Sequence, residues 1–230
     1  MRAVLLLFTI PVGAEFHIGL YNLTVPEASE EVATTGFTHV LSDDPVVAEA
    51  ARRHGLKIVG IPRPAESERS TAASAVAVWY IADEPEINRQ TPEDIARIAT
   101  AVRRWDPGSP LTLVVGDARY ARVYAPSVDA LMVDWYPVPH LPLDSVGDQV
   151  SMAASQAGGK PVFAVLQAMD WRDYPQRDPK KPRIGRFPTR EELRFMTYHA
   201  VLRGASGVYY FEFQRRSVPG KTLLDYPERW

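Results

Sequence analysis

The chain has 230 residues, a formal net charge of −2 and 46% hydrophobic residues. This length suits a single (β/α)₈ barrel, roughly 200 to 250 residues, and no Gly/Ser run or charge block divides the chain as a linker would. The mixed charge argues against nucleic-acid binding, which needs a basic patch. The lack of cysteine excludes disulfides, thiol catalysis and cysteine zinc sites. The five histidines show no metal-ligand spacing, so we expect no metal and no other cofactor.

Residues 1–14 have the order of a short signal peptide. Arg2 precedes an apolar run from Ala3 to Ile10, and Val12-Gly13-Ala14 offers small residues at a cleavage point. The run is too short to span a membrane as a helix. We therefore expect an exported protein, secreted or periplasmic in a bacterium, with one catalytic domain over residues 15–230. The alternative is a leading strand or a plug at the bottom of the barrel.

Eight short runs follow, and several are rich in β-branched and aromatic residues and bounded by Gly, Pro or Asp, as strands are. They are Phe16–Asn22, Phe37–Leu41, Lys57–Ile61, Val76–Ile81, Leu111–Val115, Ala130–Asp134, Val162–Gln167 and Val208–Phe213. Helices between them carry start and stop signals. Thr91-Pro92 begins one helix, while Thr189 with Glu192 begins another that Gly204 ends. Alternating strands and helices, eight times over, predict an α/β fold, the TIM (β/α)₈ barrel.

Two segments depart from the ideal barrel. Residues 118–129 have room for only a turn or two of helix between the fifth and sixth strands. After the last strand, Pro219-Gly220 and Pro227 interrupt any helix, so the eighth helix is expected to be reduced or absent. Either the barrel closes without that helix, or the N-terminal segment or a second subunit covers that face. A homodimer is one of these options.

Side chains alternate between the two faces of a strand, so each strand offers one set to the barrel interior. A register with apolar residues toward the helices puts polar residues in the lumen. The predicted lumen set is His17, Tyr21, Tyr80, Ala82, Glu84, Asp134, Tyr136, Gln167, Tyr210 and Glu212. Most of these lie at the carboxyl ends of strands, where active sites of this fold occur. The alternative is a structural ring of ion pairs or hydrogen bonds around the barrel mouth.

Three segments carry a resemblance to a known group. Trp79–Pro85, with the sequence WYIADEP, resembles the end of strand 4 in (β/α)₈ glycoside hydrolases, where Asn-Glu-Pro or Asp-Glu-Pro places the general acid. Asp134–Pro137 is similar to the Asp-x-Tyr-Pro segment of related barrels, and residues 188–210 are similar to their last helix and strand. The resemblance implies a glycosidase with a carbohydrate substrate and with Glu84 as general acid/base.

Gln167 departs from the pattern of these glycoside hydrolases. The large retaining clan among them has a glutamate nucleophile at this position. Three accounts stay open. Asp83 and Glu84 resemble the adjacent pair of β-N-acetylhexosaminidases, in which the acetamido group of the substrate attacks and no enzyme nucleophile is needed. Alternatively, Glu84 pairs with Asp134 or Glu212 in ordinary two-carboxylate chemistry. In the third account the barrel is a degenerate pseudoenzyme that binds glycans or only keeps its shape.

Other side chains near the same face complete the predicted substrate-binding set. Tyr136 would bind an acetamido oxygen, and Gln167 would donate a hydrogen bond to substrate. Trp135 and Trp171 lie at strand ends or in loops, where their rings could stack on sugars. Ordinary loop packing explains these two tryptophans equally well.

Overall fold

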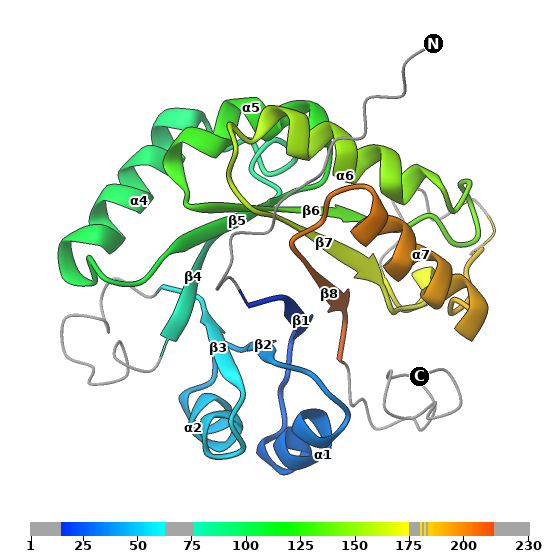
Figure 1. Cartoon of the computed structure of the whole chain (residues 1–230), viewed down its shortest axis with the longest axis horizontal. Coiled ribbons are helices and arrows are strands. Elements are labelled where there is room, and N and C mark those ends of the chain that lie inside the picture. Colours follow the sequence, from blue (N-terminus) through cyan, green and yellow to red (C-terminus); the bar gives the residue numbers. More distant parts are fainter. Residues whose placement is uncertain (1–14, 63–75, 175–179, 181, 183, 214–230) are drawn as a thin grey trace.

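A computed structural model describes residues 15–62, 76–174, 180, 182 and 184–213 of the chain. Its strands form a closed barrel in which β1 to β8 follow one another in order and every neighbouring pair is parallel (Figure 1). The strands are β1 His17–Leu20, β2 His39–Leu41, β3 Lys57–Gly60, β4 Val76–Asp83, β5 Leu111–Val115, β6 Ala130–Trp135, β7 Val162–Gln167 and β8 Gly207–Phe211. The predicted TIM barrel is confirmed. The predicted signal peptide and the reduced eighth helix fall on residues 1–14 and 214–230, outside the described residues.

Helices cover the outside of the barrel, with α1 and α2 on one side and α4 to α7 around the other in Figure 1. They are α1 Ser29–Thr34, α2 Pro45–Arg53, α4 Pro92–Trp105, α5 Ala121–Tyr124, α6 Ser145–Gln156 and α7 Arg190–Leu202. Thr91 and Thr189 cap α4 and α7 as predicted, and the structure adds a capping box at Thr91 to the one predicted at Thr189. Gly204 follows α7 with a φ of 107°, a left-handed conformation that favours glycine. The short region after β5 holds only α5, flanked by the 3₁₀ turns η3 (Ala118–Tyr120) and η4 (Ala125–Ser127).

Two hydrophobic layers hold the barrel together. The outer layer joins strands to helices and includes Leu131 of β6, Leu166 of β7 and Met196 of α7. The inner layer fills the lumen and is made almost entirely of strand residues, namely Tyr21, Leu41, Val59, Val78, Tyr80, Val114, Ala130, Met132, Phe163, Val165 and Tyr209. The lumen is therefore a packed core whose upper surface, at the carboxyl ends, is the floor of any site above it.

The predicted register is correct for β1, β6 and β7, wrong at Ala82 in β4 and reversed in β8. In β4 the pairing with β5 shifts between Tyr80 and Asp83, so that Ala82, expected in the lumen, packs in the outer layer beside Ile81. In β8, Tyr209 lies in the inner layer and Tyr210 faces outward, where its hydroxyl meets Thr197 of α7. The prediction counted alternate positions back from Glu212, but β8 ends at Phe211. Strand alternation therefore does not extend to Glu212.

The opposite, amino-terminal end of the barrel is closed by stacked rings. His17 stacks on His39 with ring centroids 3.7 Å apart and on Phe163 at 4.5 Å. The Nδ1 atom of His17 lies 2.9 Å from the Tyr209 hydroxyl. Burial lowers the pKa of His17 to about 4 and that of His39 to about 3. Both rings are therefore neutral at pH 7. His17, predicted to bind substrate, lies in the lumen as expected but at the end away from the candidate site.

This neutral pair predicts acid sensitivity. Unfolded histidine titrates near pH 6.5, well above both folded values, so the unfolded chain binds the extra proton and the protein loses stability as the pH falls below 6.5. The almost fully buried His39 alone should lower the free energy of unfolding by about 2 kcal/mol between pH 7 and pH 5. Urea unfolding of wild type and His39→Phe at both pH values measures this, and the variant should show a flatter pH dependence. The exposed His54→Gln should behave as wild type; equal slopes for all three proteins would contradict the prediction.

Candidate active site

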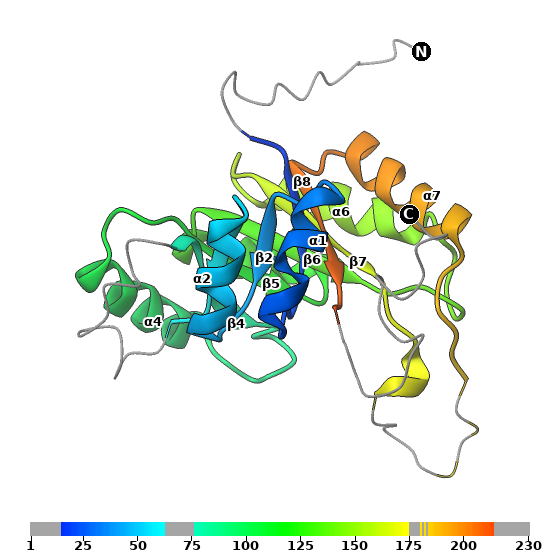
Figure 2. The same ribbon diagram turned by 90° about the horizontal axis from the view of Figure 1, so that it is seen from below.

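Acidic and aromatic side chains gather at the carboxyl ends of β4, β6 and β7. Figure 2 shows the barrel from the side, with the segment after β7, which includes η5 (Trp171–Asp173), projecting beyond the strand ends. The predicted residues Asp83, Glu84, Asp134, Tyr136 and Trp171 all belong to this end. They come from loops and strand ends that the barrel brings together, as expected for this fold.

Glu84 follows the last residue of β4 and has a positive φ of 38°, which is unusual for a residue with a side chain. Its backbone N–H donates to the carbonyl of Val114 in β5 at 3.0 Å. Its carboxyl group lies against Gly116, where an added Cβ atom would come within 2.5 Å of Oε1 of Glu84. The turn after β4 and the bare backbone of Gly116 therefore set the position of this carboxyl.

Asp83 is turned toward the lumen side of β4. The register shift between Tyr80 and Asp83 is a β-bulge, a feature that re-aims side chains next to active sites. As a result the Tyr80 hydroxyl donates to Oδ1 of Asp83 at 2.5 Å. The ring of Tyr80 meets that of Tyr21 edge to face at 5.9 Å. Tyr21, predicted at the site, thus lies in the floor beneath the carboxyl groups, where it is buried.

Asp134 is the most buried acid of the group, with 7% of its surface exposed. Burial, followed by the negative charge of Glu84, raises the pKa of Asp134 well above the ordinary range, although a hydrogen bond with Tyr136 opposes this. Its Oδ1 atom is buried and has no hydrogen-bond partner within the part of the chain that the structure describes. Ionisation of either Asp134 or Glu84 therefore disfavours ionisation of the other, an arrangement found where two carboxyl groups share a proton.

An aromatic wall stands next to these acids. Tyr136 stacks on Phe211 with ring centroids 5.3 Å apart, and Trp171 meets Tyr136 edge to face at 6.0 Å. The indole N–H of Trp171 is buried and finds no acceptor among the described residues. A ligand hydroxyl that accepts from this N–H would satisfy it, and flat aromatic faces suit the apolar faces of sugar rings.

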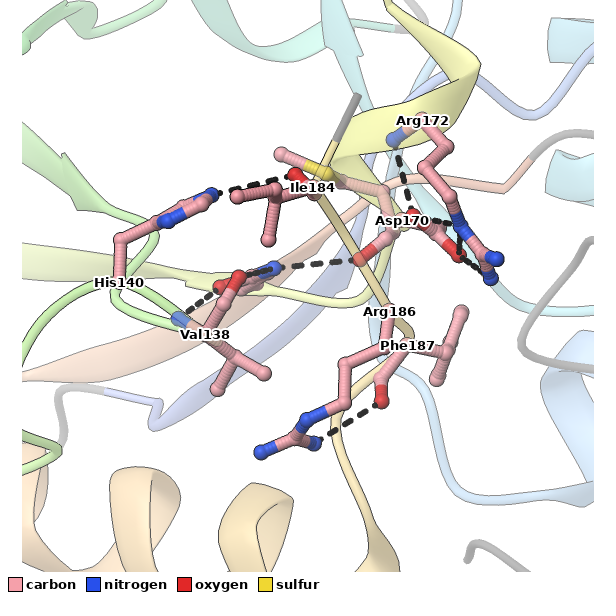
Figure 3. A network of polar contacts seen from close by, with 9 residues as sticks. Val138, His140, Asp170, Arg172, Ile184, Arg186 and Phe187 are labelled. Carbon is pink, nitrogen blue, oxygen red and sulfur yellow. Dashed lines mark hydrogen bonds and ion pairs between the residues drawn. The ribbon is translucent and has the colours of Figure 1, made fainter. Parts of the chain in front are cut away.

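Gln167 is completely buried and holds the loop after β6. Its Oε1 accepts from the N–H of Val138 at 2.8 Å, and its Nε2 donates to the carbonyls of Val138 and Met169 at 2.8 and 3.2 Å. Figure 3 shows this clamp around Val138, with Asp170 held by the backbone and guanidinium of Arg172 close by. The structure thus gives Gln167 backbone partners for both ends of its amide and places it beneath the surface.

Other predicted residues lie outside this group. Glu212 is buried and accepts from the side chain of Asn22, which joins the ends of β1 and β8. The indole N–H of Trp135 donates to Ser145 Oγ at 2.9 Å, and its ring packs against the outer layer. Tyr210 faces α7, as described above. No group of three or more histidines, aspartates or glutamates that could hold a metal ion occurs in the described ranges. No described helix is long and apolar enough to cross a membrane.

Sequence reasoning overlooked Glu86, two residues after Glu84. Its Oε1 accepts from the N–H groups of Gly116 and Asp117 at 2.6 and 3.0 Å. Burial raises the pKa of Glu86 despite these bonds, and its Oε2 is buried without a partner among the residues described. The signal available in the sequence was a third acid, Glu86, that follows Pro85 directly after Asp83-Glu84.

The overall fold is similar to that of solved glycoside hydrolases. A glycoside hydrolase family 17 β-1,3-glucanosyltransferase from Rhizomucor miehei superposes with a TM-score of 0.62 at 14% identity, covering 90% of both chains. A β-galactosidase from Marinomonas ef1 gives a TM-score of 0.69 at 11% identity, and a β-D-glucuronidase from Dictyoglomus thermophilum gives 0.61 at 15%. These matches cover 90% and 88% of this chain but 55% and 45% of the two enzymes. Neither a protein-family model nor a curated protein matches the sequence. The chain therefore has a glycosidase-like (β/α)₈ barrel.

Proposed function

We propose that this protein is a glycoside hydrolase that cleaves O-glycosidic bonds in an oligo- or polysaccharide, with Glu84 as general acid/base. The observation that carries the proposal is the electrostatic interaction of Glu84 with the buried acid Asp134, because two interacting carboxyl groups keep a shared proton that Glu84 can donate. A structural carboxyl in such a place would normally have a cation for a partner, whereas the side chains that most affect Asp134 among the described residues are Glu84, Tyr136 and Asp83. The fold of the matched glycosidases supports the proposal by analogy only.

Two routes to hydrolysis fit these residues. In one, Glu84 protonates the glycosidic oxygen as the leaving group departs, and Asp134 either activates the water that attacks the anomeric carbon or attacks that carbon itself, in which case water then hydrolyses the glycosyl-enzyme. In the other, Glu84 protonates the leaving oxygen while Asp83 steadies an acetamido group of the substrate that attacks in place of an enzyme nucleophile. The Tyr80 hydroxyl on Asp83 would then hold that carboxylate in place. The Tyr136–Trp171 wall would bind the sugar ring in either route.

The second candidate function is non-catalytic glycan binding. It is favoured by Gln167, which stands at the end of β7 where the large retaining clan has its glutamate nucleophile. The amide of Gln167 is hydrogen-bonded to backbone groups through both its oxygen and its nitrogen. The aromatic wall would serve such a role equally well, because sugar faces bind to aromatic rings without chemistry.

Hydrolysis of a panel of aryl β-glycosides, including the N-acetylglucosaminide and N-acetylgalactosaminide, tests the proposal on wild type and Glu84→Gln. The variant should lose the activity, because an amide cannot donate the proton. Glu49→Gln, an exposed acid paired with Arg52 on α2, should keep it. Cleavage of acetamido sugars only would favour assistance through Asp83, and cleavage of other sugars would favour the Glu84–Asp134 pair. No turnover together with glycan-array binding would replace the enzyme proposal by the binding function, and blank arrays would contradict both.

A further inference from the structure

The end of β5 is the surface on which the carboxyl group of Glu84 rests. A Cβ atom added to Gly116 would lie 2.5 Å from Oε1 and 3.1 Å from Cδ of Glu84. These distances mean that the carboxyl fills the space that any other residue at position 116 would use. The position of the Gly116 backbone therefore determines where the Glu84 carboxyl can sit.

The Gly116 backbone is itself held by Glu86. Oε1 of Glu86 accepts from the N–H of Gly116 at 2.6 Å and from that of Asp117 at 3.0 Å. Two N–H groups that donate to one carboxyl oxygen hold both residues in place. Without Glu86 these two N–H groups would lose their acceptor directly beneath the Glu84 carboxyl.

Glu84 and Glu86 also belong to one tight turn. The carbonyl of Glu84 accepts from the N–H groups of Ile87 and Asn88 at 2.9 and 2.8 Å, and the side chain of Asn88 donates to the carbonyl of Asp83 at 2.7 Å. This turn places the Glu84 carboxyl against Gly116 and lets the Glu86 carboxyl accept from the N–H of Gly116. A movement of Glu86 would therefore move both the Gly116 backbone that the Glu84 carboxyl contacts and the turn to which Glu84 belongs.

We propose that Glu86 is a positioning residue that sets the location of the Glu84 carboxyl through the backbone of Gly116. The inference rests on the proposed function only in taking Glu84 as the reacting carboxyl. The holding contact needs an acceptor oxygen and does not need the negative charge. An uncharged acceptor of the same size should therefore replace Glu86, while an uncharged side chain without an acceptor should not.

Glu86→Gln and Glu86→Met form the matched pair for the test. Both remove the charge and both keep the volume, so any difference between them reports the lost hydrogen bonds rather than the lost charge. Gln149→Ala is the control, because its Oε1 accepts from the N–H of Ala118 at 2.9 Å, in the same loop but two residues beyond Gly116. Melting temperatures of all three confirm that the proteins are folded.

The readout is the titration of the Glu84 carboxyl carbon, followed by ¹³C NMR of full-length protein and assigned by its loss in Glu84→Gln. We expect the titration midpoints of Glu86→Met and Glu86→Gln to differ by about half a pH unit or more, and Gln149→Ala to match wild type. Where a glycoside is cleaved, kcat should fall in Glu86→Met and be restored in Glu86→Gln, with little change in KM.

Identical Glu84 titrations in Glu86→Met and Glu86→Gln would overturn the inference, as would an equal displacement in Gln149→Ala. If Glu86→Met does not fold, Gly116→Ala decides, since its methyl group should displace the Glu84 titration with Glu86 intact. An unchanged titration there would also overturn the inference. Because the NMR titration needs no substrate, a failure of the glycosidase proposal leaves this test standing.

Discussion

Replacing Asp134 by asparagine is expected to stabilise the protein at pH 7 by about 1 kcal/mol while lowering kcat/KM on any cleaved glycoside by about 100-fold or more. Asp134 is buried beside Glu84, and its pKa is raised well above the ordinary range by burial and by that charge. A buried carboxyl that disfavours its own ionisation destabilises the fold, and it is retained where function needs it. Asparagine has the same shape and carries no titrating proton.

The sign of the pH dependence follows from the same pKa. The unfolded chain releases the Asp134 proton near pH 4, whereas the folded protein keeps it to a higher pH. The folded state therefore binds more protons, and wild type loses stability as the pH rises from about 4 through the folded pKa. Denaturant unfolding between pH 4 and pH 8 should thus show the stability gain of Asp134→Asn growing with pH. At about 2 to 4 °C per kcal/mol for a chain of this size, melting temperatures give a second measure.

Asp106 provides the matched control. Although burial opposes it, hydrogen bonds from Trp79, Ser109 and Gly108 lower the pKa of Asp106. Asp106→Asn should therefore destabilise the protein at neutral pH, with a loss that shrinks as the pH falls through the folded pKa, the opposite trend to Asp134→Asn. A loss of stability of more than 1 kcal/mol in Asp134→Asn at pH 7 would instead mark Asp134 as a structural residue.

The fold could be predicted from the sequence because the information is local. Each strand run is bounded by turn residues, and the Thr91 and Thr189 caps are written in three or four consecutive residues. The orientation of side chains needs more than alternation. One extra residue in β4 turned Ala82 outward and Asp83 toward Tyr80, and this bulge depends on how β4 pairs with β5. No pattern within β4 itself announces that pairing.

The acidic residues of the candidate site could be predicted from the sequence, but the contacts that position them could not. Asp83, Glu84, Asp134 and Tyr136 could be expected to lie at one end of the barrel because polar residues at strand ends meet at one face of this fold. The role of Glu86 depends on contacts with the backbone N–H groups of Gly116 and Asp117, just after β5 and thirty residues further along the chain. Contacts between side chains and distant backbone leave no spacing rule in a sequence, so such residues are visible only once the strands are placed.

The backbone contacts of Gln167 could not be predicted from the sequence either, and we expect their loss to have a larger effect on stability. Read as a sequence, it looks like a nucleophile that has been lost; in the structure its amide donates to the carbonyls of Val138 and Met169 and accepts from the N–H of Val138. A glutamate has no hydrogen to offer those carbonyls when ionised. Gln167→Glu should therefore lower the free energy of unfolding by about 3 kcal/mol at pH 7, because a buried carboxylate would face two carbonyl oxygens. It should also create no new hydrolytic activity.

Gln149→Glu is the control that separates this effect from a general cost of adding charge. The oxygen of Gln149 accepts from Ala118, and a carboxylate can do the same, so this variant should keep nearly wild-type stability. Urea unfolding of both variants at pH 7 and pH 5 gives the comparison, and the loss in Gln167→Glu should shrink at the lower pH as the new acid binds a proton. Wild-type stability of Gln167→Glu, joined with a gain in glycoside cleavage, would show that strand 7 carries a disabled nucleophile position. Destabilisation without activity would mean that this barrel uses the place of a nucleophile to fix the loop after β6, so that any second catalytic acid must come from another strand end.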